Sequence, residues 1–371
     1  MSEYQYYEFL ALDKPLTTEE KTYVQSLSSR VELTSTQAVF VYNYGDFRGK
    51  PKELLEKCFD VMLYMANWGS RQLMFRLPIS LVDTTVLEPY CLSRTISIST
   101  TRNFVIIDIN ICDEEISAWA EGGGWLSSLV SLRDDLLRGD LRSLYLAWLK
   151  AAPMESDEDE EEEDILEPPV PPNLQDLSAS LKTFVEFFEI DQDLIAAAAK
   201  NSDFAEEEDE DLEDLIPSLS ESERNDFLVR LVRGESHLGV QLIHRLRELS
   251  NKQEKNVDNY TPRRTLSELL KLVSEETEHR QQQEQKAASL KKIEKLEALA
   301  KKETQVWEEV FKLIELKQSK PYDQAIAYLV QLRDLAEYQG KLAEFKSSIQ
   351  QMKKDYSNRP GLISRLQKVG L

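Results

Sequence analysis

The sequence predicts an α+β N-terminal domain with a mixed sheet and helices, followed by an all-α C-terminal region of helical hairpins. Three observations predict this fold class. Segments of strand composition alternate with segments of helical periodicity up to about residue 153. Beyond residue 174 the apolar residues recur three and four apart, as in amphipathic helices. A run of acidic residues and prolines separates the two parts.

The N-terminal domain, residues 1–153, alternates predicted strands with predicted helices. Thr17, with Glu20 three residues later, predicts a capped helix to about residue 28. Pro51 opens a second helix that Asn67 ends, and its apolar stripe is Leu54, Leu55, Cys58, Val61, Met62 and Met65. Strands are expected at 6–12, 38–44, 72–77, 95–100 and 103–109, and a long helical stretch at 126–148. Helices largely on one face of a sheet fit this order, and a ferredoxin-like arrangement is one alternative.

The net charge of −22 arises in the middle sixth of the chain. Residues 155–216 carry 24 acids and 2 bases, whereas residues 1–154 and 217–371 have net charges of −5 and +5. Repelling carboxylates followed by prolines predict that residues 154–173 form a disordered linker. A second acidic run is expected to be a loop at 205–214 within a helical domain at 174–255. A solubilising role of both runs is favoured over an electrostatic tether that docks on basic helices.

Residues 256–371 are predicted to form a long helix and then helical hairpins. The long helix is expected to start at Pro262, and shorter helices follow at 303–317, 322–338 and 342–352, with a last one from 358. Residues 322–328 look like the second helix of a tetratricopeptide unit, and Trp307 before them adds to the likeness. The region is therefore weakly tetratricopeptide-like.

Two turns of the N-terminal domain carry aromatic and charged residues of the kind that dominates protein interfaces. These turns and the C-terminal hairpins supply the predicted partner-binding residues: Tyr44, Asp46, Phe47, Arg48, Trp68, Arg71, Trp307 and Tyr322. The competing interpretation is that the aromatic side chains belong to the core and that the charged ones are only solvated.

Catalytic chemistry is not expected from this residue inventory. His237 and His244 are seven residues apart, whereas a zinc-binding helix places two histidines four apart. The glycines at 122–124 lack the lysine of a P-loop and follow acidic residues, which would repel phosphate. The sequence therefore predicts no catalytic residue, no cofactor and no metal site.

The cell compartment is inferred from composition. No run approaches the about 18 consecutive apolar residues of a membrane span, and the start of the chain lacks the pattern of a secretory signal. Three cysteines are too few for a disulfide framework. We therefore expect a cytoplasmic protein without membrane contact.

Three motifs resemble a family of uncharacterised bacterial proteins. They are YYEFLAL…PL at 6–16, GDFRG at 45–49 and ANWG at 66–69. The tail around 322–326, Phe345 and 359–362 is also similar to the helical tails of bacterial SWIM-type zinc-finger proteins. The zinc ligands of those proteins are absent here, so the resemblance implies no metal. It implies, by association, work beside nucleic-acid enzymes.

These observations favour a non-enzymatic adaptor whose head and helical tail each bind a protein partner. One alternative is an accessory or regulatory subunit of a bacterial nucleic-acid-processing or defence complex, with an indirect association with nucleic acid through the basic C-terminal helices. A second alternative is an enzyme of unrecognised type.

Overall fold

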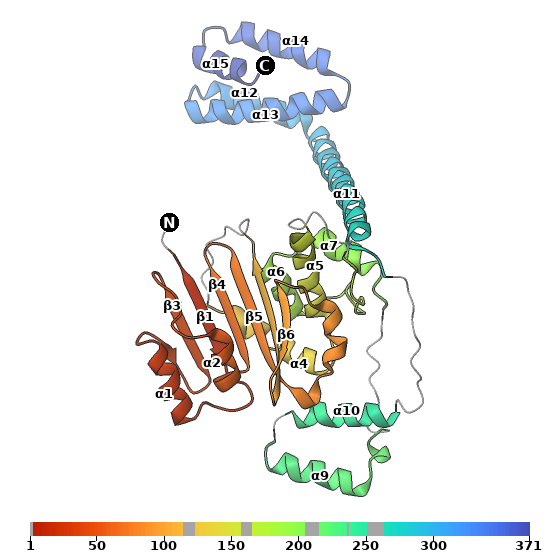
Figure 1. Ribbon diagram of the computed structural model, residues 1–371. Coiled ribbons are helices and arrows are strands. Elements are labelled where there is room, and N and C mark those ends of the chain that lie inside the picture. Colours follow the sequence, from red (N-terminus) through yellow and green to blue (C-terminus); the bar gives the residue numbers. More distant parts are fainter. Residues whose placement is uncertain (1–2, 114–122, 157–164, 205–214, 236, 251–262) are drawn as a thin grey trace. The chain divides into compact units, whose positions relative to one another are not determined.

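A computed structural model describes residues 3–113, 123–156, 165–204, 215–235, 237–250 and 263–371 (Figure 1). The chain forms two compact units, residues 1–277 and 278–371. Most of both acidic runs, and Pro262, lie outside the described residues. None of the helices within the described ranges combines the length and apolar character needed to cross a membrane.

The first unit is built on a seven-stranded sheet with the order β2-β3-β1-β4-β5-β7-β6. The predicted fold class is confirmed, but every neighbouring pair of strands is antiparallel, so the sheet is not mixed. Hairpins join β4 to β5 and β6 to β7, whereas the helix after β3 carries the chain across β1 to β4. The strands are β1 (Gln5–Leu10), β2 (Glu32–Leu33), β3 (Gln37–Tyr42), β4 (Val61–Ala66), β5 (Ser70–Pro78), β6 (Ile96–Thr100) and β7 (Phe104–Cys112).

Strand β4 replaces the second half of the helix that was predicted from Pro51. The helix, α2 (Pro51–Cys58), ends before the continuous apolar run at 61–66, and such a run fits either periodicity. Asp60 decides between them: its buried carboxylate accepts hydrogen bonds from the backbone N–H of Leu12 (2.7 Å) and Asp13 (3.0 Å). It also pairs with Arg76 at 2.6 Å. These tertiary partners fix an extended chain beside β1.

Helices cover both faces of the sheet (Figure 1). One face packs on α1 (Thr18–Leu27) and α2, and Thr17 caps α1 as predicted, with its Oγ1 3.2 Å from Glu20 N. The other face packs on five helices, to which the predicted helical stretch at 126–148 contributes three: α3 (Trp125–Leu129), α4 (Leu132–Leu137), α5 (Arg142–Ser156), α6 (Ala179–Phe188) and α7 (Gln192–Ala199).

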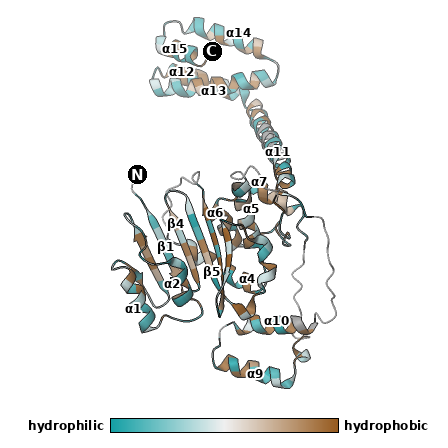
Figure 2. Ribbon diagram, in the orientation of Figure 1, coloured by the Kyte–Doolittle hydropathy of each residue, from teal (hydrophilic) through white to brown (hydrophobic). Residues whose placement is uncertain are grey.

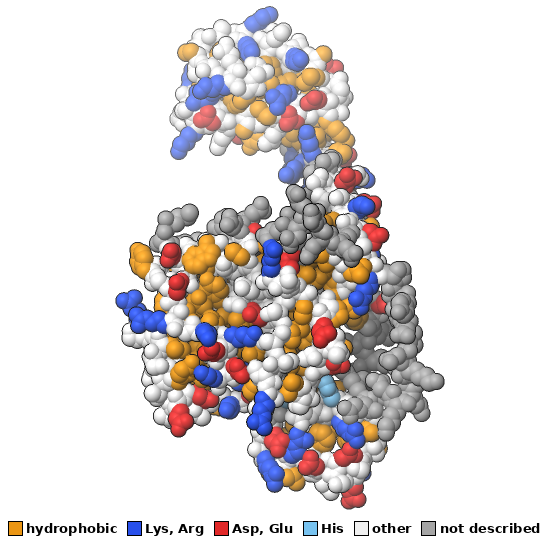
Figure 3. All heavy atoms as spheres, viewed as in Figure 1, with side chains coloured by type: hydrophobic (Ala, Val, Ile, Leu, Met, Phe, Trp, Pro, Cys, Tyr) orange, Lys and Arg blue, Asp and Glu red, His pale blue; other side chains and the backbone are white. Residues whose placement is uncertain are grey.

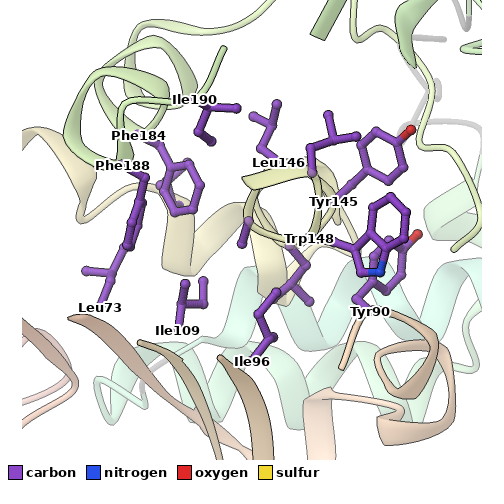
Figure 4. Packing of buried hydrophobic residues seen from close by; sticks show 14 of the residues in the cluster. Leu73, Tyr90, Ile96, Ile109, Tyr145, Leu146, Trp148, Phe184, Phe188 and Ile190 are labelled. Carbon is purple, nitrogen blue, oxygen red and sulfur yellow. The ribbon is translucent and has the colours of Figure 1, made fainter. Parts of the chain in front are cut away.

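The larger core lies between this second face and the helices α5 and α6. Figure 4 shows Leu73, Ile96 and Ile109 of the sheet beneath aromatic residues of those helices. Trp148 and Phe184 are essentially removed from solvent. Helices α6 and α7 therefore belong to the same core as the sheet, and not to a separate helical domain beginning at residue 174.

The proline-rich half of the predicted linker is packed against the first unit. Glu167 is buried. Its carboxylate accepts hydrogen bonds from the Arg264 guanidinium at 2.7 Å and another from the hydroxyl of Tyr145. Its N–H also bonds to the carbonyl of Arg264 (2.9 Å), and Tyr90 donates to the carbonyl of Pro169 (2.7 Å). The prediction of disorder is wrong for residues 165–173, because Glu167, Pro168 and Pro171 of this segment are buried in the first unit.

The acidic run also begins with a structural residue. Glu155 lies in the last turn of α5, and its carboxylate accepts hydrogen bonds from the backbone N–H groups of Arg94 and Thr95, both at 3.1 Å, and from the Ser93 hydroxyl at 3.0 Å. It thereby fixes the segment that leads into β6.

Two further helices of the first unit differ in how they are held. Helix α10 (Leu238–Ser250) buries Leu238 and Leu246, and His244 Nε2 lies 3.1 Å from the carbonyl of Leu137. Helix α9 (Glu221–Val232) has no buried residue. Figure 2 shows apolar segments on both helices.

The hairpins of the second unit match the prediction. After α11 (Leu266–Ala300), which is helical through the polar stretch at 274–289, four helices surround one apolar core: α12 (Glu303–Glu315), α13 (Ser319–Tyr338), α14 (Leu342–Asp355) and α15 (Pro360–Lys368). The likeness to a tetratricopeptide unit stays a prediction.

Candidate partner-binding surfaces

The two predicted turns of the N-terminal domain lie at the same end of the sheet. Gln5, at the start of β1, pairs with Tyr42 of β3 on one side and Ala66 of β4 on the other. Asn67 then exchanges two hydrogen bonds of 3.0 Å with the backbone of Tyr4. The turn after β3 and the turn after β4 therefore flank the beginning of β1. We call the exposed residues of these turns, Tyr44, Asp46, Arg48 and Trp68, the sheet-end surface.

The turn after β3 is held from both sides. Gly45 has a φ of 78°, a left-handed conformation that glycine adopts at little cost. Gln5 Nε2 donates to the Gly45 carbonyl (3.2 Å) and to Asp46 Oδ1 (3.3 Å). Phe47 is buried, with its ring 5.0 Å from those of Tyr7 and Phe40. Phe47 is thus the anchor of the turn and not, as predicted, a partner-binding residue.

The exposed side chains of this surface are aromatic and charged. Tyr44 is 82% exposed and Trp68 is 42% exposed. Asp46 and Arg48 are exposed too. The structure therefore places four of the predicted residues, all exposed, on two turns at the same end of the sheet.

Neutral tyrosines support the surface from below. Burial raises the pKa of Tyr7 to about 12 and also raises the pKa of Tyr64. Both hydroxyls therefore stay protonated and donate to Gln5 Oε1, at 3.0 and 3.5 Å. These two hydrogen bonds orient the side-chain amide of Gln5, so that its Nε2 donates to the turn after β3.

Arg71 does not join this surface, although it is three residues from Trp68. It is buried on the sheet face that packs on α6, and it donates to the carbonyl of Phe187 and to Glu189 Oε1 (2.9 Å). Burial lowers the pKa of the Arg71 guanidinium, while Glu189 opposes that shift. Arg71 holds the end of α6, so the prediction that it binds a partner is wrong.

The predicted residues of the second unit divide in the same way. Tyr322 is buried in the core of the unit, so it is not available to a partner. Trp307 is half-buried, with its ring 6.1 Å from that of Phe311 and 5.9 Å from that of Phe345. Phe311 is exposed, so this aromatic group is partly accessible to a partner.

A groove in the second unit was not predicted. We call it the α14 groove; it has a volume of about 400 Å³, and Phe345 and Ile349 form its apolar floor. Arg333, Lys346 and Lys353 line it, with Glu337 as the acid among its lining residues. Lys346 and Lys353 have no carboxylate within ion-pair distance in the part of the chain that the structure describes. Their spacing of seven residues, two helical turns, was the available sequence signal.

The groove suits one class of ligand chemically. An apolar floor accepts an aliphatic or aromatic side chain, and unpaired lysines at its rim attract carboxylates. An acidic peptide segment with an apolar anchor has both features.

The buried charges of the first unit form internal networks. Arg133 donates to both oxygens of Asp13, at 2.9 and 3.0 Å, and lies 3.6 Å from Asp60. His237 Nε2 lies 2.7 Å from Asp13 Oδ1, so the fold brings a histidine to the N-terminal sheet that the sequence placed far from it. Burial alone would raise the pKa of Asp13, but the hydrogen bonds from His237 and Arg133 outweigh it and lower the pKa to about 2.

This arrangement stabilises the fold, because the carboxylates of Asp13 and Asp60 are shared among internal donors. Over the described ranges, no three His, Cys, Asp or Glu side chains are placed to hold a metal ion. A cavity of about 480 Å³ beside α6 and α7 has Asp176 and Lys182 as its charged lining residues.

Comparisons of this chain with protein-family models, with curated proteins and with solved structures give no match. The two resemblances noted in the sequence therefore remain predictions.

Proposed function

We propose that this chain is a non-enzymatic adaptor that binds one protein partner at the sheet-end surface and another at the α14 groove. The observation that carries the proposal is the exposure of Tyr44 and Trp68 on turns that hydrogen bonds to Gln5 and to Tyr4 hold in place. An aromatic side chain on an already ordered turn loses little conformational entropy when a partner packs on it. Such residues are frequent hot spots of interfaces, worth about 2 kcal/mol or more each.

The second binding function rests on the unpaired lysines of the α14 groove. We propose that its partner offers an acidic segment with an apolar anchor. The proposal includes a cytoplasmic location, which the three free cysteines, Cys58, Cys91 and Cys112, support.

The test uses the immobilised full chain and extract of the native host, with bound proteins quantified by mass spectrometry. Two variants each remove one surface: Tyr44→Ala with Trp68→Ala, and Lys346→Glu with Lys353→Glu. Tyr338→Ala is the matched control, because Tyr338 is also exposed but lies outside both surfaces. We expect each double variant to lose a different bound protein while the control loses none. Identical recovery with all three variants would contradict the adaptor function.

A second candidate is the accessory subunit of a nucleic-acid complex. It is favoured by the composition of residues 278–371, which carry 18 bases and 13 acids, a net charge of +5. In that case, deleting residues 157–164 should strengthen non-specific binding to duplex DNA, most clearly at low salt. The deletion spares Glu155, which has a structural role. An unchanged gel shift would remove this candidate.

A further inference from the structure

Helix α9 presents an apolar face that the rest of the described chain does not cover. The exposed fractions are 59% for Leu228, 47% for Val229, 62% for Leu231 and 88% for Val232. Together they expose on the order of 400 Å² of apolar side chain, as large as the main apolar patch of a typical monomer, ~300–600 Å². A patch of this size on one short helix is typical of an interaction site.

The opposite side of α9 is the one that attaches to the protein. Glu223 accepts from Arg245 of α10 at 2.8 Å, and Arg230 bonds to Gln241 of the same helix. With about 3.6 residues per turn, these two positions share one side of the helix, and Leu228 and Val232 lie on the other. The apolar face therefore points away from α10, and Figure 3 shows apolar, acidic and basic side chains mixed over α9.

The charged side chains beside this face form a self-complementary pattern, in which an acid on one copy can face a base on a second copy. Asp226 and Arg233 lie on the same flank of the apolar face, seven residues or two turns apart. Asp226 is exposed and forms only a loose ion pair with Arg230, with a nearest distance of 3.6 Å between the two side chains. Arg233 is exposed and has no carboxylate within ion-pair distance among the described residues. A second α9 in antiparallel orientation would place each of these charges beside its opposite.

We propose that two copies of this chain associate through α9, antiparallel about a twofold axis that passes through the apolar contact at the level of Arg230 along the helix. Leu228 then packs on Val232 of the second copy, and the Val229 side chains of the two copies meet beside the axis. Asp226 meets Arg233 of the second copy twice, once on each side of the axis. A twofold axis requires a self-complementary surface, and a partner of unrelated sequence has no reason to match this order of charges.

The contact is small, so the dimer is weak. Two patches bury at most about 800 Å² of apolar surface together, below the about 1,200 Å² at which stable interfaces begin. We therefore expect association at micromolar or higher protein concentration, and weaker association at high salt because the flanking charges are exposed.

The experiment is sedimentation velocity of the full chain over a wide range of concentration. We expect the wild type to shift from monomer to dimer, and Val232→Asp to stay monomeric at every concentration. Val232 is almost fully exposed, so this change leaves the folded protomer intact, which circular dichroism checks. Val86→Asp is the matched control, since Val86 is another exposed valine that lies in a different part of the unit. A wild type that remains monomeric, or a Val232→Asp variant that dimerises like it, would overturn the proposal.

Charge exchange tests the orientation. Asp226→Arg and Arg233→Asp each put like charges together and should weaken the dimer by about 10-fold. The chain with both changes should dimerise like the wild type, and so should an equimolar mixture of the two single variants. If neither combination restores association, the antiparallel arrangement is wrong.

Discussion

Replacing Arg133 with methionine removes the centre of the buried charge network in the first unit. The guanidinium is 1% exposed and donates to Asp13 twice and to the carbonyl of Arg76 (2.9 Å). Breaking a buried ion pair leaves an unpaired charge and costs about 3–5 kcal/mol. We expect about 3 kcal/mol, the lower end, because Asp13 keeps His237 and Asp60 keeps Arg76.

Urea unfolding followed by tryptophan fluorescence measures this cost. A Trp307→Phe background restricts the signal to the first unit, since the other four tryptophans precede residue 278. Lys50→Met is the control, because the ion pair of Lys50 with Glu53 is exposed, and it should leave the unfolding midpoint unchanged. Adding Asp13→Asn to Arg133→Met should recover part of the loss, since the unpaired carboxylate is then neutral.

Acid provides an independent check. The pKa of Asp13 is about 2, below the ordinary 3.8, so its contribution to stability is complete above about pH 4. That contribution is lost as the pH falls through about 2. In Arg133→Met this acid-dependent loss should be smaller. A cost below about 1 kcal/mol, or identical acid profiles of variant and wild type, would refute this account of the network.

Two other predictions concern thiols and the start of α11. Cys112 is exposed, whereas Cys58 is buried and its burial raises its pKa to about 11. A disulfide reagent near pH 8 should therefore label Cys112 quickly and Cys58 only after unfolding; comparable rates would contradict the assignment. Glu167→Gln removes the carboxylate that Arg264 and Tyr145 share, so amide hydrogen exchange at residues 264–272 should accelerate, and unchanged protection would show that the ion pair does not hold α11.

The elements that sequence predicts best are those with local signals. Thr17 and Glu20 marked a helix start because a capping box involves only neighbours in the chain. The C-terminal hairpins followed from helical spacing in the same way. Strand β4 was missed because its apolar run fits both periods, and the deciding partner, Arg76, is 16 residues from Asp60.

The candidate surfaces were predicted in part. Residue type correctly selected Tyr44 and Trp68 as accessible, but it selected Arg71 and Tyr322 as well, which are buried. Side chains alternate between the two faces along a strand, and Arg71 lies on the face that packs on α6. The sequence alone does not say which of the two faces Arg71 takes, because that depends on how the strand pairs with its neighbours. The α14 groove and the exposed apolar face of α9 could not be predicted from the sequence, because they depend on which side chains the neighbouring helices leave uncovered.

Composition and local pattern by themselves determined the α+β head, the helical tail and the concentration of negative charge in the middle of the chain. Tertiary structure alone decided that Glu167 and the prolines after it belong to the folded first unit. The reason is that Arg264, which binds Glu167, lies 97 residues further along the chain. A carboxylate that would repel its neighbours in an isolated segment is stabilised once folding places that guanidinium beside it.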